Sequence, residues 1–158
     1  MGRKSNAANP PRLPQMSSNL YFAYGSNLCA ARLRELAPSA LVRGAAHAQG
    51  FALRLDKRGV DGTAKANLHA APGGVVWGAV YALDPADWTH LDARERDYAR
   101  IEIEIVQGDR RALAQTYRSD LLTDAVAAAW YKRLIVDGAR AHGLPAEWCA
   151  WLEGLPAR

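Results

Sequence analysis

Apolar residues along this chain gather in short segments, and their spacing predicts both strands and helices. Residues 20–24 form an aromatic and apolar run that favours a buried strand. The leucines that follow recur at near-helical spacing, which predicts a helix from about 27 to 37, and Pro38 ends it. The first folded unit is therefore predicted to be a strand, a tight turn and a helix.

The middle of the chain predicts strands separated by turns. Alternating apolar residues predict a strand within 41–55. Glycines and prolines predict mainly turns over 57–74, with a short strand at 65–70. Residues 75–83 carry few charges and predict a strand that is buried on both faces.

The last third predicts a helix, a hairpin and further helices. Asp84 and the proline after it mark a helix start, and this helix is expected to end near Glu95. Isoleucines alternate with charged residues over 98–106, and a Gly-Asp turn leads to a partner strand at 111–118. The remaining predicted helices span residues 124–142, beginning at Thr123 or Asp124, and 145–153.

Together these elements predict an α+β fold with a mixed sheet closed into a small β-barrel and flanked by helices. The 158 residues suit a single domain at 19–158, after a proline-containing N-terminal tail at 1–18 that is expected to be flexible. No apolar run approaches the roughly 18–20 residues of a membrane helix. The N-terminus lacks the apolar core of a signal peptide, so we expect a cytoplasmic protein without membrane contact.

Charge and cysteine content narrow the function classes. The net charge is +4, but the basic residues are dispersed, and the cluster Arg94, Arg96 and Arg100 is interrupted by acids. A nucleic-acid partner is therefore not expected, although a mild positive field suits an anionic metabolite. Cys29 and Cys149 are expected to be free thiols. The four histidines are scattered and read as surface or satisfied polar residues, and no Cys or His pair shows metal-ligand spacing, so a metal is not expected.

The most informative stretch is Tyr24-Gly25-Ser26-Asn27-Leu28. Gly25 permits a turn conformation closed to other residues, and Ser26 or Asn27 can cap the following helix. The backbone N–H groups of such a turn, with the helix dipole behind them, form a small anion site. Ser26 lacks the Gly-x-Ser-x-Gly pattern of a nucleophile, which favours a capping role for its hydroxyl.

A second candidate site is the charged segment 91–98, at a helix-to-strand junction. It combines acids and arginines with Tyr98. It is either a solvated charge run or a site in which a carboxylate beside apolar surface has a raised pKa and transfers protons. Composition alone leaves both interpretations open.

Four motifs, taken in order, resemble the γ-glutamylcyclotransferase family over residues 20–155. They are Tyr24-Gly25-Ser26-Asn27-Leu28, Val76-Trp77-Gly78, Leu91-Asp92-x-x-Glu95, and the segment from Tyr131 to Gly143-Leu144-Pro145. The resemblance implies the family's fold and its reaction. The α-amine of a γ-glutamyl amide attacks its own γ-carbonyl, 5-oxoproline forms, and the amine portion leaves without water, metal or organic cofactor.

The resemblance also implies roles for residues. The backbone N–H groups of Gly25, Ser26, Asn27 and Leu28 would hold the substrate's α-carboxylate beside Tyr24. Glu95 would act as general base and then general acid. Two further aromatic positions match the family's site, and they would either orient the substrate or Glu95 or pack in the core; these are Tyr98 and Tyr131.

Some positions depart from the family pattern. The segment Glu95-Arg96-Asp97-Tyr98 is shorter and more charged than in many members, and Ser119-Asp120 stands where relatives often have Ser-Tyr. Arg94, Arg96 or Arg100 could meet a second carboxylate on the substrate.

Several alternatives stay open at this stage. The leaving group could be an amino acid, a simple amine or a γ-glutamyl-protected metabolite. The protein could also be a non-catalytic anion-binding domain or, third, a basic nucleic-acid binder. A monomer and a homodimer are both compatible with the sequence.

Overall fold

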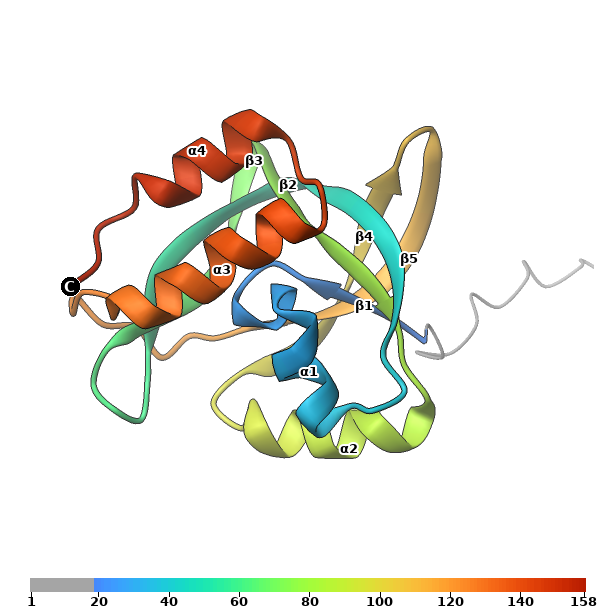
Figure 1. Ribbon diagram of the computed structural model, residues 1–158, viewed down its shortest axis with the longest axis horizontal. Coiled ribbons are helices and arrows are strands. Elements are labelled where there is room, and N and C mark those ends of the chain that lie inside the picture. Colours follow the sequence, from blue (N-terminus) through green and yellow to red (C-terminus); the bar gives the residue numbers. More distant parts are fainter. Residues whose placement is uncertain (1–18) are drawn as a thin grey trace, which may run out of the picture.

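The computed structural model describes residues 19–158, which form a closed β-barrel with helices packed around it (Figure 1). The predicted flexible tail at 1–18 lies outside the described residues. In chain order the elements are β1 (Leu20–Ala23), a 3₁₀ turn (Ser26–Leu28), α1 (Ala30–Leu36), β2 (Leu41–Arg58), β3 (Ala64–Ala82), α2 (Pro85–Arg94), β4 (Ala99–Gln107), β5 (Arg110–Arg118), α3 (Ala129–Ala141) and α4 (Ala146–Glu153).

The barrel is a mixed sheet with strand order β1-β3-β2-β4-β5. Its neighbouring strands run antiparallel except for β1 and β5, which are parallel where Tyr21 meets Gln115. Each strand contributes a fully buried apolar residue to one continuous core: Phe22, Ala48, Val80, Ile105 and Ala114. The α+β prediction with a closed mixed barrel is confirmed.

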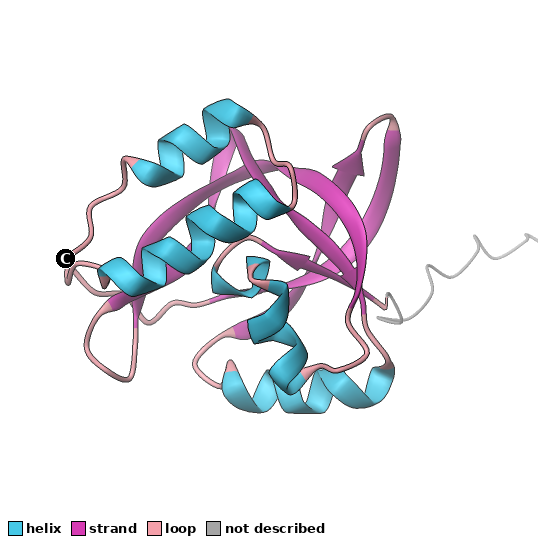
Figure 2. Ribbon diagram, in the orientation of Figure 1, coloured by secondary structure: helices cyan, strands magenta, loops and turns pink. Residues whose placement is uncertain are grey.

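The helices cover two parts of the barrel (Figure 2). Helices α3 and α4 pack against each other on one face, and α1 packs with α2 at another. The loop after β1 lies between these groups, beside α3. Within residues 19–158, no helix combines the length and hydropathy needed to cross a membrane.

The prediction of turns over 57–74 is wrong. Strands β2 and β3 are long and pair with each other along most of their length, leaving only a short turn near Gly62. The turn-forming residues 71–74 form an irregularity inside β3. On β2, Gln49 pairs with Val75 and Phe51 pairs with Ala70, so residues 71–74 of β3 have no partner in the register. Gly73, with φ at 78°, takes the left-handed conformation this irregularity requires.

The predicted helix start near residue 124 is also wrong, because α3 begins only at Ala129. Backbone groups of residues 123–128, just before α3, form hydrogen bonds with residues that are distant in the sequence. The N–H of Thr123 donates to the carbonyl of Asp56, and the N–H of Arg158 donates to the carbonyl of Ala127. These tertiary bonds override the capping pattern that the sequence offers.

Helix α3 approaches the loop after β1 closely through Gly138. A Cβ built on Gly138 would lie 2.6 Å from the carbonyl carbon and the Cβ of Leu28, and 2.9 Å from the backbone nitrogen of Cys29. Two of these atoms belong to the backbone, which cannot move aside as a flexible side chain can. Glycine is therefore required here by contact between two main chains.

We predict that Gly138→Ala destabilises the protein, although Gly→Ala inside a helix normally stabilises it by roughly 0.5–1 kcal/mol. The clash should cost about 1–3 kcal/mol, as overpacked cores do. Urea unfolding measures the difference. Gly154→Ala is the matched control, because a Cβ there lies 3.5 Å from its nearest neighbour. A Gly138→Ala variant as stable as the Gly154→Ala variant would contradict this account of the contact.

Candidate functional site

A pocket of about 290 Å³ lies where the loop after β1, the end of α2 and the start of α3 meet. Its wall includes residues 24–27, Glu95, Tyr98 and Tyr131, which are far apart in the sequence. Leu28 is not among the residues that line the pocket.

The loop is a 3₁₀ turn, and its backbone N–H groups differ in whether they are free to donate a hydrogen bond to a ligand. The N–H of Leu28 donates to the carbonyl of Gly25 at 3.0 Å, and the Leu28 side chain is buried. Leu28 is thus not available as a donor to a ligand, and the predicted set of four donors is reduced to three. The N–H groups of Gly25, Ser26 and Asn27 meet no acceptor within residues 19–158.

The predicted capping role of Ser26 and Asn27 is wrong. No side chain caps the 3₁₀ turn or α1, which begins only at Ala30. Gly25 is required for a different reason from the one expected, because its φ of −112° is open to other residues. A Cβ on Gly25 would lie 2.9 Å from the Cβ of Ala66, so glycine allows the loop to approach β3.

Glu95 caps the C-terminal end of α2 and lines the pocket opposite the loop. The amide of Asn27 links the two sides: it donates to the hydroxyl of Tyr21 at 2.9 Å and to Oε1 of Glu95 at 3.4 Å. Burial raises the pKa of Glu95 above its ordinary value, while Arg94, Asn27, Lys57 and Arg32 lower it in part. The carboxylate is consequently a stronger base than an exposed glutamate.

Tyr98 and Tyr131 both bind the main chain of Ala66 on β3. The Tyr98 hydroxyl donates to the Ala66 carbonyl at 2.7 Å, and the Ala66 N–H donates to the Tyr131 hydroxyl at 2.8 Å. These peptide groups belong to the part of β3 whose only strand partner is β2. Burial raises the pKa of Tyr131 to about 12, so this hydroxyl stays protonated at neutral pH.

Further tyrosines extend this aromatic wall. Tyr24 donates its hydroxyl to the carbonyl of Tyr117 at 2.5 Å, and Tyr117 donates to Oδ1 of Asp92 at 2.6 Å. Asp92, the acidic residue of the Leu91-Asp92 motif, is therefore a hydrogen-bond acceptor for the wall. Burial raises the pKa of Tyr24 and of Tyr117, and their hydroxyls stay neutral.

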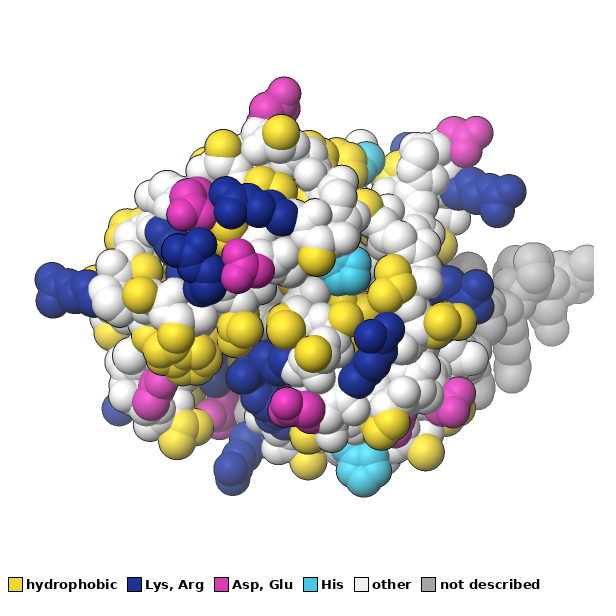
Figure 3. Space-filling model, viewed as in Figure 1, with side chains coloured by type: hydrophobic (Ala, Val, Ile, Leu, Met, Phe, Trp, Pro, Cys, Tyr) yellow, Lys and Arg dark blue, Asp and Glu magenta, His cyan; other side chains and the backbone are white. Residues whose placement is uncertain are grey.

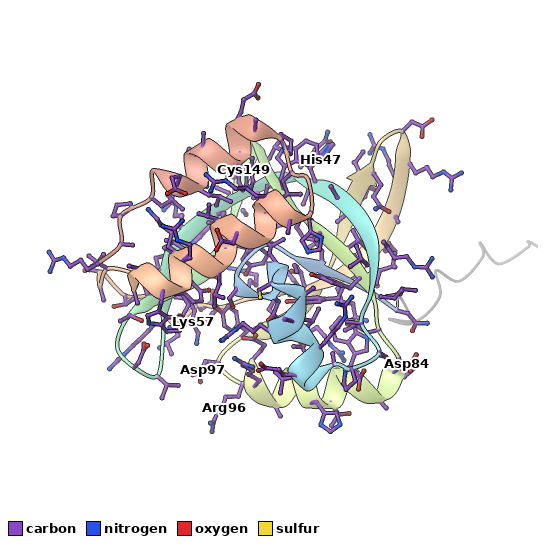
Figure 4. The ribbon with its side chains drawn as sticks, in the orientation of Figure 1. His47, Lys57, Asp84, Arg96, Asp97 and Cys149 are labelled. Atoms are coloured by element: carbon purple, nitrogen blue, oxygen red, sulfur yellow. The ribbon has the colours of Figure 1, made fainter. Side chains whose placement is uncertain are left out.

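Three cations that the sequence did not point to also line the pocket: Arg32, Lys57 and Lys65. Lys57 is buried, lies 3.7 Å from Oδ2 of Asp97 and sits 4.6 Å from the centre of the Tyr98 ring. Figure 4 shows Lys57 and Asp97 near each other below α3, with Arg96 directed away from them. No periodicity or motif separates these cations from surface basic residues.

Of the three arginines proposed for a second carboxylate, only Arg94 lines this pocket. Arg100 instead lies 4.8 Å above the ring of Trp88 and 3.6 Å from Oδ2 of Asp92. On the face shown in Figure 3, basic and acidic side chains are interspersed and form no basic stripe.

A polar pair behind the loop was also missed. The carbonyl of Leu28 lies 2.9 Å from Nε2 of His142 and accepts a bond from the Tyr81 hydroxyl at 3.3 Å. Tyr81 and His142 are themselves 2.7 Å apart. His142, expected to be an unremarkable polar residue, thus helps to fix the far end of the loop.

Cys29 and Cys149 are free thiols, as predicted. Within the described residues, no group of three or more His, Cys, Asp or Glu side chains is arranged to hold a metal ion. The chemistry the pocket offers is thus anion binding by N–H groups and cations, together with proton transfer by one carboxylate with a raised pKa.

Comparisons with known proteins identify the family of this chain. The model of the AIG2-like family matches residues 75–152. A gamma-glutamylcyclotransferase of Mus musculus is 34% identical over 148 residues, covering 86% of this chain and 78% of that protein. The Homo sapiens gamma-glutamylcyclotransferase is 33% identical over 156 residues, covering 90% and 81%.

A solved structure of a gamma-glutamyl cyclotransferase superposes on this fold with a TM-score of 0.83, at 28% identity and over 88% of each chain. Sequence identity and fold agree over nearly the same length of chain. On these grounds the chain belongs to the γ-glutamylcyclotransferase family.

Proposed function

We propose that this protein is a γ-glutamylcyclotransferase. It converts a γ-glutamyl amide into 5-oxoproline and a free amine or amino acid. The nitrogen of the α-amine forms a bond to the γ-carbonyl carbon, and the bond from that carbon to the amide nitrogen breaks. Two protons leave the α-ammonium nitrogen, and both end on the leaving nitrogen, which is released as an ammonium group. Atoms and charges therefore balance without water or a redox partner.

One observation carries the proposal: Glu95 and residues 25–27 line a single pocket, and the N–H groups of these three residues meet no acceptor within residues 19–158. The relatives named gamma-glutamylcyclotransferase support the assignment of the reaction. A glutamyl unit has a carboxylate and an ammonium group on the same carbon. A pocket that presents N–H donors beside a basic carboxylate is complementary to that pair of charges.

In this proposal the N–H groups of Gly25, Ser26 and Asn27 bind the α-carboxylate. Glu95 takes a proton from the α-ammonium and gives it to the leaving nitrogen, and the second proton lost by the α-nitrogen also ends on the released amine. Asn27, which contacts Oε1 of Glu95, orients the carboxylate. Tyr98 and Tyr131 shape the wall through Ala66, and Tyr24 supports it through Tyr117.

Positioning supplies much of the acceleration because nucleophile and carbonyl belong to the same molecule. Holding the glutamyl chain folded places the amine in attack geometry, and oriented ring closures of this kind gain up to about 7–11 kcal/mol. Proton transfer by a positioned carboxylate adds roughly 10²–10⁴-fold. The protein needs only to hold one end of the substrate and to move protons from the α-nitrogen to the leaving nitrogen.

We expect Glu95→Gln to lower the rate of 5-oxoproline release by at least about 100-fold, because the amide cannot accept the ammonium proton. The assay uses a panel of γ-glutamyl amino acids and γ-glutamylamines, and it follows both 5-oxoproline and the released amine. Glu102→Gln is the matched control, since Glu102 is exposed on β4. Turnover by the Glu95→Gln variant at the rate of the control would remove Glu95 from the mechanism.

The pH dependence of kcat/KM should show an acid limb above about 4.3, the ordinary value for glutamate. The reason is that Glu95 must be ionised to act as a base and burial raises its pKa. The Asn27 hydrogen bond lowers this pKa, so Asn27→Ala should move the limb to still higher pH. An acid limb that stays in place in Asn27→Ala would show that the amide does not act on the base.

The raised pKa also predicts a gain in stability for Glu95→Gln. Folding makes Glu95 bind its proton more tightly, so its favourable contribution exists below the unfolded-state value of about 4.3 and is lost as pH rises through the folded-state value. Glutamine does not ionise, so Glu95→Gln removes this pH-dependent loss of folding stability. Relative to wild type, the variant should therefore be more stable at pH 7 than at pH 4. Chemical denaturation at both pH values tests this, and an equal difference at the two would contradict it.

A further inference from the structure

Arg32 on α1 is a pocket-lining cation without a hydrogen-bond or ion-pair partner among the residues that the structure describes. No hydrogen bond or ion pair joins its guanidinium to any residue between 19 and 158, and its Nε is buried. The neighbouring Arg34 differs, because its Nε donates to the carbonyl of Ala40 at 3.2 Å. A buried, unpaired guanidinium donor is costly, and such a group calls for a specific explanation.

The other cations of the pocket interact with acidic or aromatic side chains or with solvent. Lys57 lies beside Asp97 and over the Tyr98 ring. Lys65 pairs with Asp61 at 3.2 Å and lies 4.7 Å from the centre of the Tyr131 ring. Arg94 is exposed to solvent, so water can bind it. Among these cations, Arg32 combines a buried donor atom with the lack of an acceptor.

The surroundings of Arg32 indicate which charge it would meet. Helix α1 follows the donor loop in the chain, after a single connecting residue. The positive charge of Arg32 acts on Tyr131, whose hydroxyl would lie 3.6 Å from a Cβ on Gly25, and on Glu95 across the pocket. Arg32 thus lies in the same pocket as the donor loop and Glu95, on the helix that follows that loop.

We propose that Arg32 binds the α-carboxylate of the glutamyl substrate together with the N–H groups of Gly25, Ser26 and Asn27. This assignment rests on the proposed function. A guanidinium presents several N–H donors in one plane and matches the two oxygens of a carboxylate. The bound substrate supplies the acceptor that Nε lacks in the free protein, and the charge selects an α-carboxylate over a neutral group.

The test compares the binding of 5-oxoproline, which has the carboxylate, with that of 5-oxoprolinamide, which is neutral. Calorimetry measures both ligands with wild type, Arg32→Gln, Arg32→Lys and the control Arg34→Gln. Arg32→Gln should weaken the binding of 5-oxoproline by about tenfold or more, as expected for a lost hydrogen bond to a charged group. The affinity for 5-oxoprolinamide should not change. Arg32→Lys should restore part of the loss, and Arg34→Gln should bind as wild type does.

Equal effects of Arg32→Gln on both ligands, or none on either, would overturn the proposal. If Arg32→Gln does not fold, an NMR titration of the wild-type protein tests the proposal instead. The Nε–H resonance of Arg32 must shift when 5-oxoproline is added and must not shift when 5-oxoprolinamide is added. Wild type that releases no 5-oxoproline from any γ-glutamyl amide refutes the proposed function itself. Normal release by wild type, with an unchanged KM in Arg32→Gln, refutes only the role of Arg32.

Discussion

The close contact between helix α3 and the loop after β1 is the constraint on which the rest of the site depends. Gly138 removes the side chain that would separate the two main chains, and Gly25 does the same where the loop meets Ala66. Tyr131, in the first turn of α3, then reaches the main chain of Ala66 on β3. A loop held so closely from two sides keeps its N–H groups in a fixed direction, so little conformational entropy is lost when they bind an anion.

The same packing determines the electrostatics of the pocket. Burial makes ionised Glu95 less stable than in water, and this is the property that a proton acceptor for an ammonium group needs. The nearby cations Arg94, Lys57 and Arg32 lower the pKa of Glu95 and so oppose part of the effect of burial. The site therefore stores unfavourable charge interactions that the fold must offset elsewhere, a cost shared by many active sites.

The sequence predicted the barrel and the two main parts of the site because these depend on local patterns. The aromatic run before Tyr24 and the segment ending at Glu95 carry their signals within a few residues. The start of α3 was misplaced because Thr123 and its neighbours bond to distant strands. The roles of Lys57, Tyr81 and His142 were missed for a related reason, since their partners are remote in sequence and no spacing rule links them. Gly25 was identified correctly as a special position, but for the wrong physical reason.

The central claim is that one pocket holds both the carboxylate-binding N–H groups and Glu95. Adding 5-oxoproline to ¹⁵N-labelled protein tests it most directly by NMR. The account predicts that the largest changes in amide shift fall on Gly25, Ser26 and Asn27, with smaller changes near Glu95. Shift changes confined to another surface, such as the groove beside Trp148 and Trp151, with residues 25–27 unaffected, would contradict it.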